Sequence, residues 1–583
     1  MSVERIITEN LDIWTSAIKT KSASGRGSST KLELYGIKRL KDLVLSLAIH
    51  GKLTTQNISD SSVDELISVL VSKNKTDGNK VNLEKVNLST VVPFQIPESW
   101  RWLNLGFCAR VFSGNTFKSQ DFSKENGCRV IKITNAGVGK LVETDEFLPE
   151  RYKEEHNKFL VFEGDIILAL TRPYISDGLK VSLCNKTYDK SLLNQRVAAC
   201  RAYINNRYLY LVLRSSYVLN TYQNRFSGNG LQPNLKVKDV TELPIPIPPE
   251  EEQKRIVAKV DALLALCDQL ESQTEASIKA HQTLVKSLLE TLTNAKDADE
   301  LNESWQRISA HFDVLFTTED SIDQLKQTIL QLAVMGKLVK QDPNDEPASK
   351  LLERIEVEKV QLIKDKKIKK QTELKEVNES DFPFSTPEGW AVVRLGALIP
   401  QFQNGVSSRG DKKGKETIVL RLADIKDWRI SENDTRRLII NEETIEKYLL
   451  KKGDTLIIRV NGSSEIVGRF ITVEKVTDAI YCDHFIRMRF PIPCIEPNYL
   501  AILGSSRLVR DKISDLFIST AGQKTVNQTH ISSLTLSIPP IMEQKRISER
   551  VRYLVAICDE LKSKLQTVQR TISNVADSVK ANY

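Results

Sequence analysis

Side chains that form strong hydrogen bonds gather on turn-rich stretches in two separate parts of the chain, within residues 115–234 and 403–527. Arginine, lysine, asparagine, glutamine and serine on such turns can pair with base edges or hold phosphate groups. The candidates in the first part are Asn115, Lys118, Arg129, Lys132, Asn135, Arg172, Tyr174, Arg196, Asn229, Gln232 and Asn234. The candidates in the second part are Gln403, Asn404, Ser407, Arg409, Lys412, Arg421, Arg459, Asn461, His484, Gln523, Lys524 and Asn527.

Two arginines stand out because each lies at the end of a short apolar run that begins with Gly-Asp. Arg172 follows GDIILAL and Arg459 ends GDTLIIR, and we expect the two to occupy equivalent places. A guanidinium there could bind guanine with two hydrogen bonds, worth roughly 1–3 kcal/mol of discrimination, or could hold a phosphate. Many of the other candidates could equally be solvated turn residues, as in Asn229-Gly230 and Asn461-Gly462.

The chain lacks recognisable catalytic motifs. It contains no Asn-Pro-Pro-Phe-like methyltransferase motif, no GxxxxGK[ST] phosphate loop and no spaced acidic nuclease cluster. The nearest approach to a phosphate loop, GVSSRGDKKGKET at 405–417, has Glu416 where serine or threonine is needed, and we interpret it as a basic loop. His281 has no cysteine or carboxylate grouping, so we assign it no chemical role. The eight cysteines form no CxxC pair, which favours buried thiols over zinc or disulfides.

The composition is typical of a folded protein with several domains. The 583 residues are 40% hydrophobic and 27% charged, so two or more cores are expected. The net charge of +8 weakly favours a polyanionic partner. No run approaches the roughly 18 apolar residues of a membrane span, and the amino terminus does not resemble a signal peptide. We therefore expect a cytoplasmic protein without membrane association.

Four segments of the chain occur twice in the same order, which predicts an internal repeat of about 290 residues. IPESWRWLNLG at 96–106 returns as TPEGWAVVRLG at 386–396, and FEGDIILAL at 162–170 returns as KKGDTLIIR at 451–459. The segment that contains Glu-Gln-Lys-Arg-Ile at 243–272 returns at 534–563, and IKRLKDLVLSLAIHGKL at 37–53 returns as IDQLKQTILQLAVMGKL at 322–338. Each copy consists of a globular part followed by a helical part.

Both helical parts carry a heptad pattern of apolar residues, which predicts an antiparallel coiled coil within the chain. The carboxy-terminal seam is Ile547, Val551, Leu554, Cys558, Leu561, Leu565, Val568, Ile572, Val575 and Val579. The central seam is Ile256, Val260, Leu263, Cys267, Leu270 and Thr274, and after one stutter Ile278, His281, Val285, Leu288 and Leu292.

The expected fold class is α+β (mixed α/β), with two globular domains separated by long helices in a pseudo-twofold repeat. We expect a helical amino-terminal arm at 1–94, a globular domain at 95–250, a central helical region at 251–340, a charged helix or linker at 341–384, a second globular domain at 385–540 and a coiled-coil helix at 541–583. SASGRGSST at 22–30 is expected to be a mobile loop, and the charged tract at 349–380 could be helix or linker.

Two variable globular domains, each opening with Pro-Glu-x-Trp and followed by Pro-Pro, Glu-Gln and a long helix, resemble the specificity subunits of type I restriction-modification systems. The likeness covers nearly the whole chain, and LYGIKRLKDLVLSLAIHGKL in the amino-terminal arm is similar to the EcoAI-like (type IB) branch. The resemblance implies that each globular part is a target-recognition domain for one half of a bipartite, asymmetric site in double-stranded DNA.

The resemblance also implies partners and cofactors. Two methyltransferase subunits would dock on the helices, and restriction subunits with motor and nuclease activity would join them. S-adenosylmethionine, ATP and magnesium would serve those partner subunits, and no cofactor or metal is expected on this chain. The repeated Glu252-Gln253-Lys254-Arg255 and Glu543-Gln544-Lys545-Arg546 could cap helices or contact the methyltransferase subunits.

Two other functions stay open at this point. A coiled-coil scaffold without a DNA role would also show heptads, but it would not need two diverged globular domains rich in basic turns. An enzyme with an unrecognised active site would predict methyl transfer or cleavage by the isolated chain. We expect no catalysis by the isolated chain.

Overall fold

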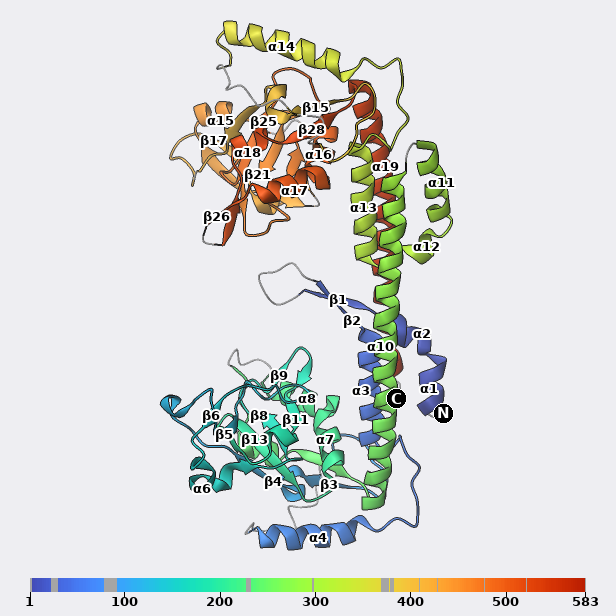
Figure 1. The fold of residues 1–583 in the computed structure, drawn as a ribbon. Helices are drawn as coiled ribbons and strands as arrows, with labels where there is room; N and C mark the ends of the chain where they lie inside the picture. Colours follow the sequence, from blue (N-terminus) through green and yellow to red (C-terminus); the bar gives the residue numbers. More distant parts are fainter. Residues whose placement is uncertain are drawn as a thin grey trace. The chain divides into compact units, whose positions relative to one another are not determined.

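The computed structural model describes residues 3–22, 30–77, 92–226, 232–295, 298–368, 377, 382–407, 409–426, 428–431, 433–475, 478–520 and 522–581 (Figure 1). The chain divides into two compact units. Unit 1 combines Met1–Thr20, Leu32–Glu275 and Gln569–Tyr583, and unit 2 combines Lys21–Lys31 and Ala276–Val568. Residues 23–29 of the loop expected at 22–30, the Asn229-Gly230 turn and most of the tract from 369 to 381 lie outside the described residues.

The first globular domain is built on two four-stranded sheets within unit 1. One sheet has the strand order β11-β8-β13-β4, and the other has the order β6-β5-β12-β7 with β5 and β12 parallel. All four residues of β8 are buried, as expected for a strand covered on both faces. The strands are β3 (Arg101–Asn104), β4 (Ala109–Ser113), β5 (Cys128–Ile131), β6 (Phe147–Leu148), β7 (Leu160–Val161), β8 (Ile166–Ala169), β9 (Tyr174–Ile175), β10 (Gly178–Leu179), β11 (Val181–Leu183), β12 (Ser191–Leu193), β13 (Val197–Ala202) and β14 (Pro244–Ile247).

The second globular domain, in unit 2, repeats one four-stranded sheet and three strands of the other, and its second sheet has no counterpart of β7. Its sheets have the strand orders β16-β25-β21-β23 and β20-β17-β24, with β17 and β24 parallel. The strands are β15 (Ala391–Arg394), β16 (Gln401–Asn404), β17 (Lys415–Leu420), β18 (Ile425–Lys426), β19 (Arg429–Ile430), β20 (Arg437–Ile440), β21 (Thr455–Ile458), β22 (Val460–Asn461), β23 (Phe470–Thr472), β24 (Ala479–Tyr481), β25 (Phe485–Arg489), β26 (Ile518–Thr520), β27 (Gln523–Thr525) and β28 (Thr535–Ile538).

The two globular domains also share a close backbone approach that requires glycine. A Cβ added at Gly114 would lie 1.9 Å from the carbonyl oxygen of Leu193, and one added at Gly405 would lie 2.0 Å from that of Cys482. The parallel bridges that follow, Asn115 with Asn194 and Val406 with Cys482, match as well. The internal repeat predicted from the sequence is therefore confirmed by the order of the matched strands and by these parallel bridges.

Helices and several small sheets make up the rest of each unit (Figure 1). In the part of the chain that the structure describes, no helix combines the length and apolar character that a bilayer-spanning segment needs. Unit 1 contains α1 (Val3–Glu9), α2 (Leu11–Ser16), α3 (Tyr35–Ile49), α4 (Val63–Thr76), α5 (Leu105–Cys108), α6 (Tyr152–Glu155), α7 (Asn206–Arg214), α8 (Ser216–Phe226) and α9 (Val237–Thr241), and the hairpin strands β1 (Lys19–Ser22) and β2 (Thr30–Glu33) precede α3. Unit 2 contains α11 (Ala298–Ser309), α12 (Phe312–Leu315), α13 (Glu319–Val334), α14 (Ala348–Lys364), α15 (Glu442–Tyr448), α16 (Pro497–Ser505), α17 (Arg507–Asp515) and α18 (Gln528–Ser532).

Two long helices, α10 (Glu250–Asn294) and α19 (Ile541–Ala581), each contribute to both units. They pack together, because Val285 and Leu292 of α10 share an apolar cluster of unit 2 with Val551, Leu554 and Cys558 of α19. The chain follows them in opposite directions, since α10 leaves unit 1 for unit 2 and α19 returns. The expected α+β class with long packed helices is confirmed.

In each unit a shorter helix contacts the long helix through a lysine, and the two lysines occupy equivalent positions of the repeat. Lys41 of α3 lies 2.7 Å from Asp268 of α10, and Lys326 of α13 forms an ion pair with Asp559 of α19. The matching position of these pairs follows from the repeat of residues 37–53 at 322–338. Each unit therefore builds its helical part from one arm helix and one long helix with the same polar contact.

The sequence predicts a heptad seam along the whole of α19, but the seam does not continue to the end of the helix. Val568 and Val575 are exposed, whereas Ser573 and Ala576 are buried. The reason is a change of partner, because the last turns contact the amino-terminal arm in unit 1. The hydroxyl of Tyr35 donates to a carboxylate oxygen of Asp577 at 2.8 Å there.

Candidate nucleic-acid interface

A buried ion pair anchors the Gly-Asp strand in each globular domain. Arg201 Nη2 donates to Asp165 Oδ2 at 2.7 Å, and Arg489 Nη2 donates to Asp454 Oδ2 at 2.6 Å. Both aspartates are buried, and both arginines also donate to a backbone carbonyl at the start of the same turn. The pair fixes the base of β8 and of β21, so the residues after these strands emerge at a defined place.

Backbone hydrogen bonds at the end of these strands show which residues of the two domains correspond. The amide of Leu170 donates to the carbonyl of Arg196 at 2.9 Å. The amide of Arg459 donates to the carbonyl of His484 at 2.7 Å. Leu170 therefore corresponds to Arg459, and Arg196 corresponds to His484.

Two residues further along, Arg172 corresponds to Asn461. The amide of Arg172 donates to the carbonyl of Pro233 at 2.9 Å, and Asn461 pairs with Lys524 between β22 and β27. The expectation that Arg172 and Arg459 are equivalent is therefore wrong by two residues. Both arginines lie just past a Gly-Asp strand, but at different distances from it.

Four candidates of the first domain lie together around Arg172. With the amide oxygen of Gln232 turned toward it, the guanidinium Nε of Arg172 donates to that oxygen at 2.6 Å. Asn234 pairs with Thr171 across an isolated bridge, and Tyr174 begins the short strand β9. Arg172, Gln232 and Asn234 are exposed, and Arg172 has a left-handed backbone with φ of 49°, which is uncommon outside glycine.

Three further candidates lie on neighbouring turns of the first domain. Asn115 pairs with Asn194, and its carbonyl accepts a hydrogen bond from the amide of Gln195 at 3.0 Å. Arg196 follows directly and has an exposed side chain, while its carbonyl is held by the end of β8. Lys118 is exposed at the start of the next 3-10 turn. Asn115 and Arg196 are thus brought close to the Arg172 group, and Lys118 lies further along the same connection.

Asn135 is a candidate that the structure assigns to the interior. Its side chain is fully buried, and its Oδ1 accepts from the amide of Lys132 at 2.8 Å. Its Nδ2 donates to the carbonyl of Val142 and to the hydroxyl of Tyr188, both at 2.9 Å. These contacts close a turn and leave no polar group for DNA, so Asn135 is corrected to a structural residue.

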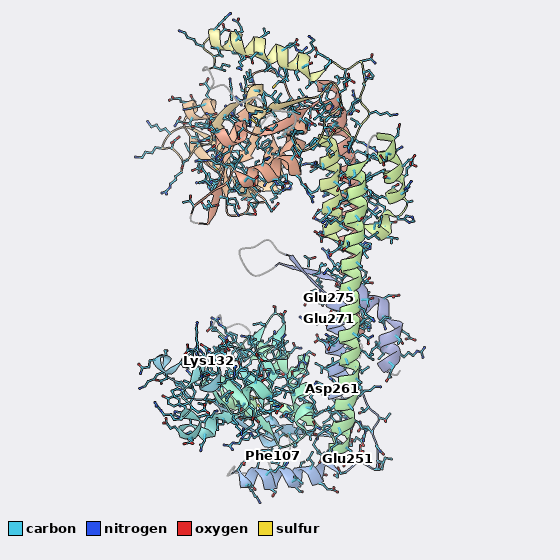
Figure 2. All side chains as sticks on the ribbon, viewed as in Figure 1. Phe107, Lys132, Glu251, Asp261, Glu271 and Glu275 are labelled. Carbon is cyan, nitrogen blue, oxygen red and sulfur yellow. The ribbon has the colours of Figure 1, made fainter. Side chains whose placement is uncertain are left out.

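Arg129 and Lys132 are half-buried and already have partners in the first domain. Arg129 donates to the carbonyl of Thr144 at 3.0 Å and lies over the ring of Phe147. Lys132 lies on the globular part of unit 1 (Figure 2) and donates to Glu146 Oε1 at 2.9 Å. Either side chain would have to exchange these partners to contact a phosphate. Asn229 lies outside the described residues.

Six candidates of the second domain gather around β22, β27 and the turn before β25. Arg459 precedes β22 and Asn461 ends it, and the partner strand β27 contains Gln523 and Lys524. The carbonyl of Arg459 accepts from the amide of Val526 at 3.0 Å, which brings the adjacent Asn527 to the same place. His484, Gln523 and Asn527 are exposed, and the other three are half-buried.

Gln403 and Asn404 end strand β16 and make polar contacts within the second domain. Gln403 Oε1 accepts from the hydroxyl of Tyr481 at 3.1 Å, and Asn404 Oδ1 accepts from Gln528 Nε2 at 3.1 Å. Because Gln528 directly follows Asn527, Asn404 lies near the group described above. Gln403 and Asn404 are thus brought into the same region, although both amides already have a partner.

The basic loop of the second domain is exposed. Ser407, Arg409 and Lys412 are all exposed, whereas Arg421 is half-buried. A hydrogen bond to the buried carboxylate of Asp424 raises the pKa of Arg421 above its ordinary value. Arg421 therefore carries a charge that is paired within the domain. Arg409 and Lys412 of the loop have long, exposed side chains that suit contacts with phosphates.

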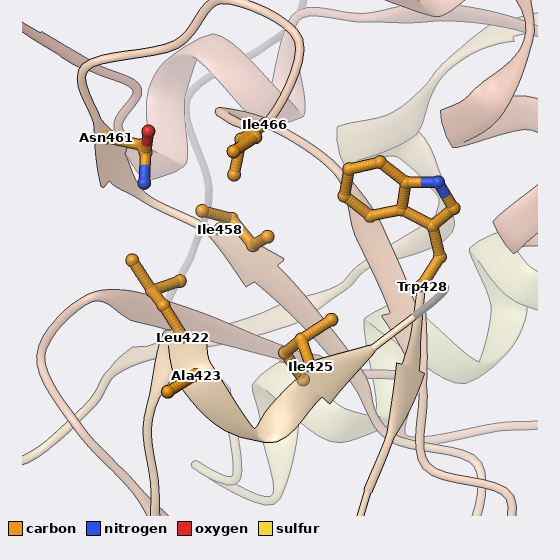
Figure 3. A pocket seen from close by; sticks show the side chains of 7 residues that line it. All are labelled: Leu422, Ala423, Ile425, Trp428, Ile458, Asn461 and Ile466. Carbon is orange, nitrogen blue, oxygen red and sulfur yellow. The ribbon is translucent and has the colours of Figure 1, made fainter. Parts of the chain in front are cut away.

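An apolar pocket of about 450 Å³ opens next to Asn461 in the second domain (Figure 3). It is lined by Leu422, Ala423, Ile425, Trp428, Ile458, Asn461 and Ile466. The sequence does not indicate this pocket. Most of its lining residues are aliphatic and look like ordinary core residues, and Trp428 lies far from Asn461 in the sequence. The signal that was available is the repeat itself, which aligns Trp428 with a glycine of the first domain.

One cluster among the described residues has side chains suited to a metal ion. Single ligand atoms of Cys482, Asp483 and His484 all lie within 4.8 Å of one another. Burial raises the pKa of the Cys482 thiol above its ordinary value, which opposes loss of its proton. All eight cysteines are free thiols, and seven of them are buried as predicted.

The repeated Glu-Gln-Lys-Arg motif ties each long helix to its own globular domain and arm. Trp100 donates its indole N–H to Glu252 Oε2 at 2.8 Å, and Gln253 Nε2 donates to the carbonyl of Pro248 at 2.9 Å. Arg255 donates to Asp60 at 2.7 Å. The second copy repeats these bonds with Trp390 to Glu543, Gln544 to Pro539 and Arg546 to Asp345. Among the residues of the two motifs, only the lysines, Lys254 and Lys545, are exposed.

Comparison with known protein families also divides the chain into two copies of one domain. The family model described as type I restriction modification DNA specificity domain matches the chain twice, at residues 97–280 and 387–569. Among solved structures, the HsdS subunit from Thermoanaerobacter tengcongensis is similar at 17% identity and a TM-score of 0.38, over 84% of this chain and 97% of that one.

Two curated relatives from Escherichia coli match over the full length. The EcoEI specificity subunit is 35% identical over 599 residues, and the EcoAI specificity subunit is 33% identical over 606 residues, with 99% of both chains covered in each case. The expected similarity to the EcoAI-like branch is confirmed, and a DNA-specificity role is favoured over a scaffold or an unrecognised enzyme. The chain belongs to the family of DNA specificity subunits of type I restriction-modification systems.

Proposed function

We propose that the two globular domains read different halves of one bipartite, asymmetric DNA target. The observation that carries this proposal is a difference in chemistry at corresponding positions of one scaffold. Arg172 corresponds to Asn461, and Leu170 corresponds to Arg459. Arginine pairs best with the two acceptors of guanine, whereas asparagine pairs best with the donor and acceptor of adenine. The same backbone with different edge-reading groups would recognise different bases.

The proposed contacts combine base-reading groups with phosphate-binding groups. In the first domain they are Arg172, Tyr174, Gln232, Asn234, Asn115, Arg196 and Lys118, with Arg129 and Lys132 after exchange of partners and Asn229 as a prediction outside the described residues. In the second domain they are Arg459, Asn461, His484, Gln523, Lys524, Asn527, Gln403, Asn404, Arg421, Ser407, Arg409 and Lys412. We retain 95–250 and 385–540 as the two recognition domains, and 1–94, 251–340, 341–384 and 541–583 as the parts that carry them.

The chain is part of a type I restriction-modification complex, and we propose that each unit binds one methyltransferase subunit. Supporting this, Leu266 of α10 and Ile557 of α19 occupy the same repeat position, and their exposed fractions are 62% and 38%. Exposed apolar side chains at matching places suit two copies of one partner. Restriction subunits would join this assembly in the cytoplasm, and S-adenosylmethionine, ATP and magnesium would bind the partner subunits.

The reading of two halves is tested with Arg172→Ala and Asn461→Ala in the assembled methyltransferase complex. The target is first obtained by mapping modified adenines in the genome of a host that carries the whole system. Binding is then measured to duplexes in which either half of the target is scrambled. We expect Arg172→Ala to lose roughly 1–3 kcal/mol of discrimination in one half, and Asn461→Ala in the other. Loss in the same half for both variants, or in neither, would contradict the proposal.

The docking of two methyltransferases is tested with Leu266→Glu and Ile557→Glu. Each single variant should bind one methyltransferase subunit and the double variant none, because a charge in an apolar contact is costly. Native mass spectrometry of the co-purified complexes measures the stoichiometry. Lys286→Glu on the exposed face of α10 is the control and should leave two subunits bound. Retention of both subunits by the double variant would place the contact elsewhere.

A further inference from the structure

A short hairpin is closed by the same backbone hydrogen bond in both globular domains, but one residue of its turn differs in kind. The amide of Val142 donates to the carbonyl of Asn135, and the amide of Ser431 donates to that of Asp424, both at 2.8 Å. Inside these bonds, Ala136 bridges Leu141 in the first domain, and Ile425 pairs with Ile430 in the second. Counting between the matched pairs, Gly139 of the first domain corresponds to Trp428 of the second.

Trp428 adopts a backbone conformation that suits glycine. Its φ is 60°, and that of Gly139 is 80°. A left-handed conformation is unfavourable for a residue with a bulky side chain, and such outliers are concentrated where a site depends on them. Trp428 also has an exposed fraction of 44%, so burial does not account for a tryptophan at this place.

A nearly buried arginine holds the ring of Trp428 in position. The guanidinium carbon of Arg469 lies 4.4 Å from the centre of the ring. Arg469 is itself fixed, because its Nε donates to the carbonyl of Glu465 at 2.9 Å and its side chain is only 12% exposed. The ring is therefore supported on one face by a rigid, paired cation instead of moving freely in solvent.

The ring of Trp428 forms one wall of the apolar pocket (Figure 3). Leu422, Ile425, Ile458 and Ile466 supply aliphatic surface, and Asn461 is the single polar side chain of the lining. Asn461 belongs to the group that we propose to contact DNA, so the pocket is continuous with that surface. The lining contains no cation, which makes a phosphate group an unsuitable occupant.

We propose that this pocket receives the 5-methyl group of a thymine in the half-site that the second domain reads. This inference rests on the proposed function. Among the base edges in the major groove, thymine alone presents a methyl group, and apolar side chains recognise it. The Asn461 amide at the rim suits the polar edge of the same or the neighbouring base pair. The first domain has Gly139 at the position of Trp428, so it lacks this indole ring, and we expect it to read its half without this contact.

The experiment replaces thymine by uracil, one position at a time, in both half-sites of the mapped target. Uracil keeps base pairing and removes only the methyl group. With the assembled methyltransferase complex, we expect one position in the second half-site to lose about fourfold in affinity, the effect of burying one methyl-sized group. At positions in the first half-site, any change of affinity on replacing thymine by uracil should be the same with and without the Trp428 side chain.

The matched variant is Trp428→Gly, which copies the residue of the first domain. Glycine relieves the left-handed backbone, which offsets part of the packing that is lost with the ring, so thermal unfolding should show that the domain remains folded. Trp428→Gly should bind the thymine duplex and the uracil duplex equally, at the level that the unmodified chain shows for uracil. Trp428→Phe, which keeps an aromatic wall, should retain part of the preference for thymine.

Two outcomes overturn the inference. In the first outcome, no uracil substitution in the second half-site weakens binding. A second half-site that contains no thymine on either strand counts as the same outcome. The other outcome is a thymine preference that Trp428→Gly leaves intact. Failure of the proposed function is distinguishable, because Asn461→Ala would then leave reading of the second half-site unchanged, whereas failure of the pocket alone leaves the effect of Asn461→Ala in place.

Discussion

Trp100 donates its indole N–H to Glu252 at 2.8 Å, and this bond joins the start of the first globular domain to the start of α10. The other oxygen of the carboxylate accepts from Gln56 at 2.7 Å and from Thr54 at 3.1 Å, both in the amino-terminal arm. One buried carboxylate therefore connects three parts of unit 1. Glu543 repeats the arrangement in unit 2 with Trp390 and Gln341.

Glu252→Ala should destabilise unit 1 strongly. The variant leaves the buried indole N–H of Trp100 and the amide of Gln56 without an acceptor, and we expect a loss of about 3 kcal/mol in the free energy of unfolding. Denaturant unfolding followed by circular dichroism measures it. Lys254→Ala, two residues away and exposed, is the control and should change stability by less than about 0.5 kcal/mol. Equal stability of the two variants would show that the carboxylate is not a junction.

His50 should make the stability of unit 1 depend on pH. Burial lowers the pKa of His50 below its ordinary value of 6.5, although its Nδ1 lies 2.7 Å from the carbonyl of Ser46. The folded state therefore binds fewer protons than the unfolded state in the range just below pH 6.5. The free energy of unfolding should be highest above that pH and should fall as the solution is acidified through this range.

The matched variant for this effect is His50→Met, because the second repeat has Met335 at the corresponding position. Methionine does not titrate, so the slope of the melting temperature between about pH 7 and pH 5 should become shallower. Ring stacking of His50 on Phe94 is lost in the same variant, which lowers stability at all pH values alike. An unchanged slope would mean that His50 does not contribute to the pH dependence.

Arg489→Met should destabilise the second globular domain. It leaves the carboxylate of Asp454, which is 1% exposed, without its cation, and breaking a buried ion pair costs roughly 3–5 kcal/mol. Arg437→Met, which removes an exposed pair with Glu416, is the control and should cost less than about 0.5 kcal/mol. Adding Asp454→Asn to Arg489→Met should restore part of the loss, and a further loss instead would argue against an unpaired charge as the cause.

Lys524→Ala and Asn461→Ala should differ in their response to salt. The two residues are cross-strand neighbours, but only lysine can neutralise a phosphate. We expect Lys524→Ala to lower the slope of log K against log salt concentration by about 1, with similar losses on all DNA sequences. Asn461→Ala should keep the slope and lose discrimination between bases. Titrations at several salt concentrations with target and scrambled duplexes distinguish the two, and a reversed pattern would exchange the assigned roles.

The repeat, the fold class and the long packed helices could be predicted because they depend on local periodicity and on copied segments. The register of the proposed DNA-binding residues could not be predicted. Arg172 and Arg459 look equivalent beside Gly-Asp, but their hydrogen bonds to Pro233 and His484 show that they differ by two positions. The prediction that Asn135 contacts DNA is wrong for a similar reason, because its partner Tyr188 lies 53 residues away in the sequence.

The end of α19 shows another limit of sequence patterns. The heptad pattern continues through Val568 and Val575, but the helix changes its packing partner before them. Such a change is set by the amino-terminal arm, which is remote in sequence. The sequence does not indicate a role for Trp428, because tryptophan is usually a core residue. Its left-handed backbone and its exposure are visible only in the structure.

The matched turns at Asn135 and Asp424 have a consequence for how specificity can evolve. The segments they close have the same number of residues and the same closing bonds, while their tips differ completely. If the tips contact DNA as we propose, exchange of a tip between the two halves, or with a related gene by recombination, would leave the length of the turn and its closing bond unchanged. New targets would then arise by shuffling small cassettes on a conserved frame.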